Sequence, residues 1–200
     1  MGVNFSASFQ HSFDYKSIQE FKEELIKGVR FPRIVQFILK VNENNPHLRM
    51  EWSLNRQRII ESLNFDPFDP IAIGDEEYIE VSGPGGFDFI FNKYMCDFNS
   101  CFRWYSFLKD PELQLELRSI CKEIADYFSC DSTIYIGDSY GSLDYVFEGR
   151  DMEYYKADLI KRFGEDQARC TLEDLLDKSV KENKSVGYFI DIFNDLKNWE

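Results

Sequence analysis

The start of the chain alternates between apolar and polar residues, which is the pattern of a strand with one buried face. The apolar positions are Val3, Phe5, Ala7, Phe9, His11 and Phe13, and the intervening positions are Asn4, Ser6, Ser8, Gln10 and Ser12. This alternation predicts a half-buried strand over residues 3–13.

Two helices are predicted to follow. Ser17 and Glu20 have the spacing of a capping box, in which two side chains satisfy backbone N–H groups at a helix start. Apolar residues then recur at helical spacing, at Ile18, Phe21, Leu25 and Val29. Gly28 marks the end of this helix, and Pro32 begins a second helix that ends near Asn44 to Pro46.

The middle of the chain is predicted to be rich in strands. Residues 48–54 alternate as a strand does, residues 58–63 fit a short helix, and the two prolines of residues 66–70 predict a loop. Residues 77–81 and 87–91 have strand patterns on either side of a glycine-rich segment, so we expect a hairpin there.

A further strand is predicted over residues 101–108, followed by a long helix. Asp110 suits the N-cap of this helix and Pro111 its first position. Residues 133–136 have the pattern of a short buried strand, and residues 143–147 are predicted to be its partner strand.

The last part of the chain predicts more helices. Asp151 begins one that Gly164 ends, and Thr171 begins another. The apolar residues after Tyr188 fit either a helix or a strand, and we favour a helix. Strands that cluster, with helices grouped around them, indicate an α+β fold with a mainly antiparallel sheet of about six or seven strands and helices packed against it. We predict a single domain over residues 1–200, because no low-complexity linker divides the chain.

The composition predicts a phenylalanine-rich core in a soluble, cytoplasmic protein. The chain contains 19 Phe and 11 Tyr, and large rings bury much area at a small cost in side-chain entropy. No apolar run approaches the roughly 20 residues that a membrane span needs. The five cysteines are odd in number and irregularly spaced, which predicts reduced, mostly buried thiols. Residues 1–6 fit the myristoylation pattern, but we interpret them as the start of a strand.

The net charge of −13 narrows the choice of partner. Nucleic acids and anionic membranes attract basic surfaces, so we expect neither as a partner. A basic protein partner fits this charge, because long-range attraction would steer it toward the acidic surface.

The sequence contains no recognisable catalytic set. His11 lies on the apolar side of the first predicted strand, where a core role is expected, and His47 follows a proline in a turn. The Gly-x-Ser-x-Gly motif of a nucleophile elbow is absent. A pair formed by a cysteine and a histidine stays open, because such partners meet in space rather than in sequence. The glycine-rich residues 82–86 lack the lysine of a phosphate-binding loop, so we interpret them as a turn. We therefore predict no cofactor and no metal ligand.

One pair of segments suggests a carboxylate site. Ile71 to Asp75 and Ile134 to Asp138 each have the pattern of a short strand that ends in Gly-Asp. If these strands were parallel neighbours, both aspartates would lie on one rim of the sheet, where they could bind a cation or share acid and base roles. The candidate interaction residues at this rim are Asp75, Glu76, Glu77, Asp138, Tyr140 and Asp144.

Two hypotheses of function follow from the sequence. The first is a non-catalytic protein-binding module with an acidic surface, of which an immunity-type protein that neutralises a basic partner is one concrete form. The alternative is a hydrolase or metal-dependent enzyme that uses the carboxylates at the strand ends. Gly-Asp is also ordinary turn chemistry, which weakens the second hypothesis.

Overall fold

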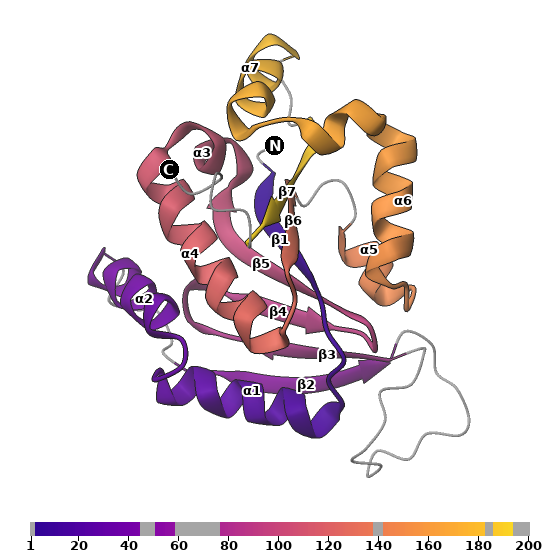
Figure 1. The fold of residues 1–200 in the computed structure, drawn as a ribbon. Helices are drawn as coiled ribbons and strands as arrows, with labels where there is room; N and C mark the ends of the chain where they lie inside the picture. Colours follow the sequence, from indigo (N-terminus) through magenta and orange to yellow (C-terminus); the bar gives the residue numbers. More distant parts are fainter. Residues whose placement is uncertain (1–2, 45–50, 59–76, 138–141, 183–185, 194–200) are drawn as a thin grey trace.

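The computed structural model describes residues 3–44, 51–58, 77–137, 142–182 and 186–193 (Figure 1). Strands and helices follow one another along the chain as β1 (Asn4–Gln10), α1 (Tyr15–Lys27), α2 (Pro32–Asn44), β2 (Ser53–Arg58), β3 (Glu77–Ser82), η1 (Pro84–Gly86), β4 (Asp88–Phe91), β5 (Met95–Arg103), α3 (Trp104–Lys109), α4 (Pro111–Phe128), β6 (Ser132–Gly137), α5 (Ser142–Phe147), α6 (Met152–Phe163), η3 (Glu165–Arg169), α7 (Leu172–Glu182) and β7 (Tyr188–Ile192).

The strands form one seven-stranded sheet in the order β2-β3-β4-β5-β1-β6-β7. Every pair of neighbouring strands is antiparallel. The prediction of an α+β fold with a mainly antiparallel sheet is therefore confirmed. Strand β1 lies inside the sheet, between β5 and β6.

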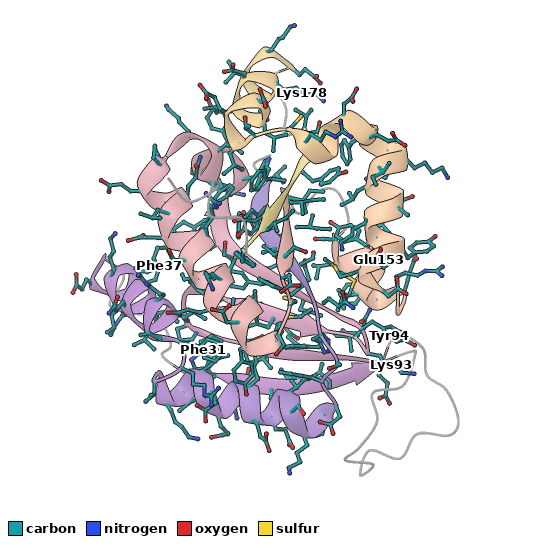
Figure 2. The ribbon with its side chains drawn as sticks, viewed as in Figure 1. Phe31, Phe37, Lys93, Tyr94, Glu153 and Lys178 are labelled. Carbon is teal, nitrogen blue, oxygen red and sulfur yellow. The ribbon has the colours of Figure 1, made fainter. Side chains whose placement is uncertain are left out.

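Helices cover both faces of this sheet (Figure 1). The larger core lies on the face covered by α1, α2, α3 and α4, and it contains Phe5, Phe9, Phe21 and Phe98. A smaller apolar cluster lies on the opposite face, under α5 and α6, and it contains Val146, Met152 and Tyr155. Figure 2 shows the side chains that fill the space between these layers.

Phenylalanine dominates the larger core, as the composition predicts. The ring of Phe21 on α1 lies 5.1 Å from that of Phe89 on β4 and 5.3 Å from those of Phe31 and Phe128, measured between centroids. Most of these contacts are edge-to-face or tilted, which is the arrangement that the charge distribution of an aromatic ring favours.

Several predicted helix ends are confirmed. Gly28 ends α1 with a φ of 69°, a left-handed conformation that glycine adopts without steric strain. Asp110 caps α4 by accepting hydrogen bonds from the N–H groups of Glu112 and Leu113. Asp151 caps α6, and Gly164 follows its last residue. Such ends depend on a few adjacent residues, which is why local sequence predicts them well.

The first strand and the first helix differ from their predictions. β1 is buried on both faces, because Ser6 and Ser8 are as inaccessible as Phe5. A central strand has neighbours above and below it, so alternation alone does not show which face is solvated. Helix α1 begins before Ser17, since its N-cap is Asp14, whose Oδ1 accepts hydrogen bonds from Ser17 N at 2.8 Å and from Ser17 Oγ at 2.7 Å.

Two predicted strands are helical instead. The predicted strand over residues 101–108 combines the end of β5 with helix α3, whose Trp104, Phe107 and Leu108 are buried at helical spacing. Residues 143–147 belong to helix α5 and are not the partner strand of β6. Short apolar runs fit both the helical repeat of about 3.6 residues and the two-residue repeat of a strand, so tertiary contacts decide between helix and strand.

The C-terminal segment is a strand, contrary to the predicted helix. β7 pairs with β6 from Ser132↔Ile192 to Ile136↔Tyr188. This pairing places Asp191 on the face of the larger core, where the guanidinium group of Arg118 from α4 binds its carboxylate. The segment is a strand because its backbone pairs with the edge of β6. The local sequence does not show that this edge is available, so only the tertiary structure decides between helix and strand.

The remaining predictions are resolved in part. The hairpin β3–β4 is confirmed. Strand β2 begins at Ser53, later than the predicted strand over residues 48–54, and most of the predicted helix over residues 58–63 and the loop over residues 66–70 lie outside the described residues. All five cysteines are free, but only Cys96 and Cys121 are buried, so the prediction of mostly buried thiols is wrong.

Asn92 joins the β4–β5 turn to helix α5. Its Oδ1 accepts hydrogen bonds from Tyr94 N and Met95 N, and its Nδ2 donates to the carbonyls of Val146 and Arg150 at 3.1 and 2.9 Å. We expect Asn92→Ala to lower the free energy of unfolding by about 2–3 kcal/mol, because buried backbone groups lose their partners. Urea unfolding measures this loss, and the exposed Asn55→Ala is the control. A change in Asn92→Ala no larger than that of the control would contradict the prediction.

Candidate functional site

The structure describes two of the six predicted interaction residues. Glu77 begins β3 and is 8% exposed, and Asp144 is exposed on α5. The two elements touch, since the rings of Tyr78 and Phe147 lie 4.8 Å apart. Outside the described residues lie Asp75, Glu76, Asp138 and Tyr140. Tyr78 faces α5, so the adjacent Glu77 points to the other face of β3 together with Ile79, and the structure does not bring the side chains of Glu77 and Asp144 together.

The arrangement of the two Gly-Asp segments as parallel neighbours stays a hypothesis, because residues 71–75 and Asp138 lie outside the described residues. Both edges of β6 are occupied, by β1 on one side and β7 on the other, and both neighbours are antiparallel. The carboxylate site with Asp75 and Asp138 on a shared rim stays a prediction.

A different polar surface crosses the sheet from β2 to β1. Residues that pair directly across an antiparallel sheet place their side chains on the same face. One row of paired positions consists of Ser53, Ser82, Asp88, Asn99 and Ser6. The next row on the same face consists of Asn55, Glu80, Ile90, Asp97 and Ser8. We call these two rows the acidic face.

The acidic face passes from solvent into the interior. Ser53 and Asn55 on β2 are exposed, and Glu80 and Asp88 on β3 and β4 are partly buried. Burial is the main cause that raises the pKa of Asp88, with a hydrogen bond from Ser82 acting against it and the charge of Glu80 adding to it. None of the side chains described in the two rows is a lysine or an arginine.

Asp97 forms the buried end of the acidic face. Its side chain is completely inaccessible. Oδ1 accepts hydrogen bonds from Ser6 Oγ at 2.7 Å and Ser8 Oγ at 2.8 Å, and Oδ2 accepts one from Asn99 Nδ2 at 2.7 Å. Burial raises the pKa of Asp97 to about 6, against the opposing effect of these hydrogen bonds.

Helices α5 and α6 cover Asp97. Ser142, the first residue of α5, lies 3.4 Å from Asp97 Oδ2 and 3.0 Å from Ser6 Oγ, measured from its hydroxyl oxygen. Tyr155 of α6 is buried on the same side of the sheet with its hydroxyl unpartnered among the described residues, and the charge of Asp97 adds to burial in raising the pKa of Tyr155. The partners of Asp97 are thus neutral hydroxyl and amide groups, and its charge is solvated by dipoles.

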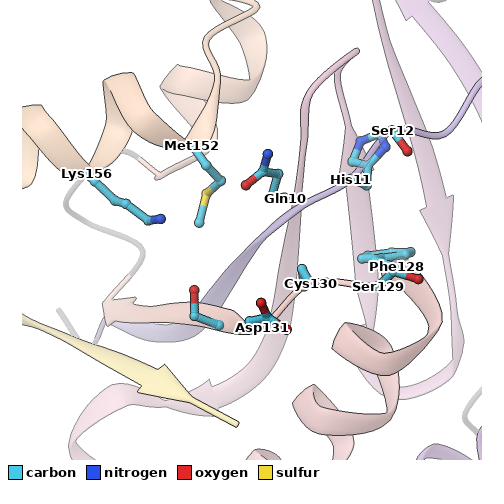
Figure 3. A pocket seen from close by; sticks show the side chains of 10 residues that line it. Gln10, His11, Ser12, Phe128, Ser129, Cys130, Asp131, Met152 and Lys156 are labelled. Atoms are coloured by element: carbon cyan, nitrogen blue, oxygen red, sulfur yellow. The ribbon is translucent and has the colours of Figure 1, made fainter. Parts of the chain in front are cut away.

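A polar cavity of about 390 Å³ lies where the end of β1 meets the α4–β6 junction and α6 (Figure 3). Gln10, His11, Cys130, Asp131 and Lys156 contribute to its walls. Figure 3 shows Lys156 and Met152 reaching toward Gln10 from α6, with Asp131 on the other side of the cavity. His11 and Cys130 line this one cavity, and they are one of the cysteine–histidine combinations that the sequence leaves open.

The protonation states of His11 and Cys130 are opposite to those of an activated pair. Burial lowers the pKa of His11 to about 4, although nearby backbone carbonyls act in the other direction. Burial also raises the pKa of Cys130 to about 11. A nucleophilic cysteine needs a stabilised thiolate, and a base needs a pKa near the working pH. His11 is a core residue, as predicted, with Nδ1 accepting a hydrogen bond from Phe13 N.

An apolar groove of about 420 Å³ lies between α1 and α2 on the other face of the sheet. Its walls include Leu25, Ile26, Leu39 and Trp52. Ile26 is 52% exposed and Leu39 is 50% exposed, so part of this groove is an apolar surface in contact with solvent. Exposed apolar patches of this kind often take part in protein contacts.

Comparisons of the chain with protein-family models, with curated proteins and with solved structures found no match. Among the described residues, no three His, Cys, Asp or Glu side chains are placed to share a metal ion. In the same part of the chain, no helix has the length and apolar character that crossing a membrane requires.

The acidic face was missed by the sequence analysis, although its signal was present. The polar residues Ser6 and Ser8 alternate with the apolar residues of β1, and Asp97 and Asn99 alternate in the same way in β5. The first alternation by itself predicts a solvated face, and the sequence predicts no strand over residues 95–100. Only the pairing of β1 with β5 shows that these polar positions meet.

Proposed function

We propose that this protein is a non-catalytic binding module that holds a basic protein partner on its acidic face. The observation that carries the proposal is the polar row Ser53, Ser82, Asp88 and Asn99 of β2 to β5, with Glu80 in the next row. Glu80 and Asp88 are partly accessible, and no side chain of the two rows is a lysine or an arginine. The carboxylate of Asp144 on α5 extends the same negative region, because α5 contacts β3, β4 and β5.

Electrostatic complementarity supports this kind of partner. The raised pKa of Asp88 shows that burial and the charge of Glu80 already make ionisation unfavourable there. Lysine or arginine side chains of a partner would relieve this repulsion between carboxylates. The net charge of −13 would also accelerate the encounter with a basic protein at low ionic strength.

The test uses a fluorescent lysine peptide of about ten residues as a defined basic probe. We expect it to bind the protein at about 20 mM salt and to lose about tenfold or more in affinity at about 200 mM salt, because salt screens exposed charges. We expect Glu80→Gln combined with Asp88→Asn to weaken the binding about fivefold, since two unit charges at the contact are removed. Fluorescence anisotropy measures both effects.

The matched control removes two acidic charges elsewhere. Glu173 and Asp177 are exposed on α7, which lies at the opposite end of the molecule from β2 and β3 (Figure 1). Glu173→Gln combined with Asp177→Asn should change the affinity by less than about twofold. Equal effects of the two double variants would show that only the net charge matters and would overturn the assignment of the acidic face.

A third variant distinguishes the acidic face from the apolar groove. Leu39→Ser removes an exposed apolar side chain from the groove and changes no charge. If binding uses the acidic face, this variant binds the lysine peptide as the unchanged protein does. A loss in Leu39→Ser as large as that in the Glu80 and Asp88 variant would place the contact in the groove instead.

A further inference from the structure

We propose that Asp97 couples binding at the acidic face to proton release, so that a basic partner favours the ionised form of Asp97 and acidic pH weakens binding. This inference rests on the proposed function, because it concerns the same surface. It gives the buried carboxylate of Asp97 a role in binding, whereas its charge does not stabilise the fold.

The first step of the argument is that the described partners of Asp97 are uncharged. Ser6 and Ser8 face it from β1, Ile90 from β4, Ser142 from α5 and Tyr155 from α6. Its own strand contributes Asn99 on the same face and Cys96 on the other. Tyr155 and Cys96 are the titratable groups of this set, and burial raises the pKa of both well above their usual values, so neither changes its charge near neutral pH.

The second step is that the accessible carboxylates lie close to Asp97. Asn99, which donates a hydrogen bond to Asp97, pairs directly with Asp88. Asp97 pairs with Ile90, and Ile90 pairs with Glu80. Diagonal neighbours on two strands are about 7–8 Å apart, and two strand spacings are about 10 Å. A cation that binds Asp88 or Glu80 therefore lies within about a Debye length of Asp97.

The third step is that Asp97 titrates in a useful range. Its pKa of about 6 means that a modest change in the local potential shifts its charge near neutral pH. A cation at the acidic face stabilises the carboxylate, so the pKa of Asp97 is lower in the complex than in the free protein. The resulting gain in affinity is present above pH 6 and is lost as the pH falls through the pKa of the complex.

The experiment measures binding of the lysine peptide between about pH 5 and pH 7.5 in the unchanged protein and in Asp97→Asn. Screened interactions at these distances correspond to a change on the order of three- to tenfold in affinity. We expect the affinity of the unchanged protein to fall by this factor toward pH 5, beyond any fall that Asp97→Asn also shows. The fall in affinity that both proteins show comes from protonation of Asp88 and of the exposed carboxylates.

A second measurement works without any variant. Carbon-detected NMR of side-chain carboxyl groups follows the titration of Asp97 with and without saturating peptide. We expect the midpoint to move to lower pH when the peptide is bound. Identical pH profiles for the two proteins, or a midpoint that the peptide does not move, would overturn the coupling and leave the proposed function intact. Absence of peptide binding at every pH would overturn the proposed function itself.

Discussion

Replacing Asp191 with alanine is expected to lower the free energy of unfolding by about 3–5 kcal/mol, because it leaves the charge of Arg118 without its buried partner. Arg118 donates from Nε to Asp191 Oδ2 at 2.7 Å and from Nη2 to Oδ1 at 3.0 Å. Tyr135 donates a third hydrogen bond to Oδ2 from its hydroxyl. Asp191 is completely buried, and the side chain of Arg118 is 13% exposed, so solvent cannot replace the lost contacts.

This carboxylate connects three elements of the fold. It lies on β7 and binds Arg118 of α4 and Tyr135 of β6, so it holds the last strand of the sheet against the larger core. Urea unfolding followed by circular dichroism measures the loss. The control is Asp126→Ala, which removes a solvent-exposed ion pair with Lys122 on the same helix and should cost less than about 1 kcal/mol. Similar losses in the two variants would show that the Asp191 cluster does not stabilise the fold in this way.

Asp97→Asn is expected to have the opposite effect at neutral pH. The pKa of Asp97 rises from 3.8 to about 6 on folding, since burial disfavours the charged form. Such a shift corresponds to about 3 kcal/mol of stability. The folded state binds the proton more tightly, so this contribution is fully present below pH 3.8 and is lost as the pH rises through 6. Removing the charge with asparagine keeps the size of the side chain.

The prediction concerns the difference between the two proteins as the pH changes. Between about pH 4 and pH 7, the stability of Asp97→Asn should increase relative to the unchanged protein by about 2–3 kcal/mol. Urea unfolding of both proteins at several pH values measures this difference. Groups that titrate alike in both proteins cancel when one free energy of unfolding is subtracted from the other. A difference that does not change with pH, or one that falls toward pH 7, would contradict the assigned ionisation of Asp97.

A buried charge that destabilises the fold fits a role in binding. Proteins retain locally unfavourable groups where function uses them, and other interactions offset their effect. The larger core, with its many aromatic contacts on the other face of the sheet, provides such an offset here. Asp97 and Asp191 are therefore two buried carboxylates with different roles. One is neutralised by an arginine and stabilises the structure, and the other is solvated by hydroxyl and amide groups beneath an accessible acidic surface.

The sequence by itself determined the local features of this protein. The caps at Asp110 and Asp151, the glycine that ends α1 and the β3–β4 hairpin all depend on residues adjacent in the chain, and all were predicted. The α+β class and the phenylalanine core also followed, because clustered alternating patterns and abundant rings leave few other ways to bury apolar surface.

Tertiary structure alone decided the features that depend on which strands meet. Residues 143–147 and 188–192 are short apolar runs that fit either period, and their contacts with the sheet made the first a helix and the second a strand. The pairing of β1 with β5 buries Ser6 and Ser8 against Asp97. Polar residues alternate in both β1 and β5, but adjacent residues do not show which strands pair, so the acidic face could be found only in the folded sheet.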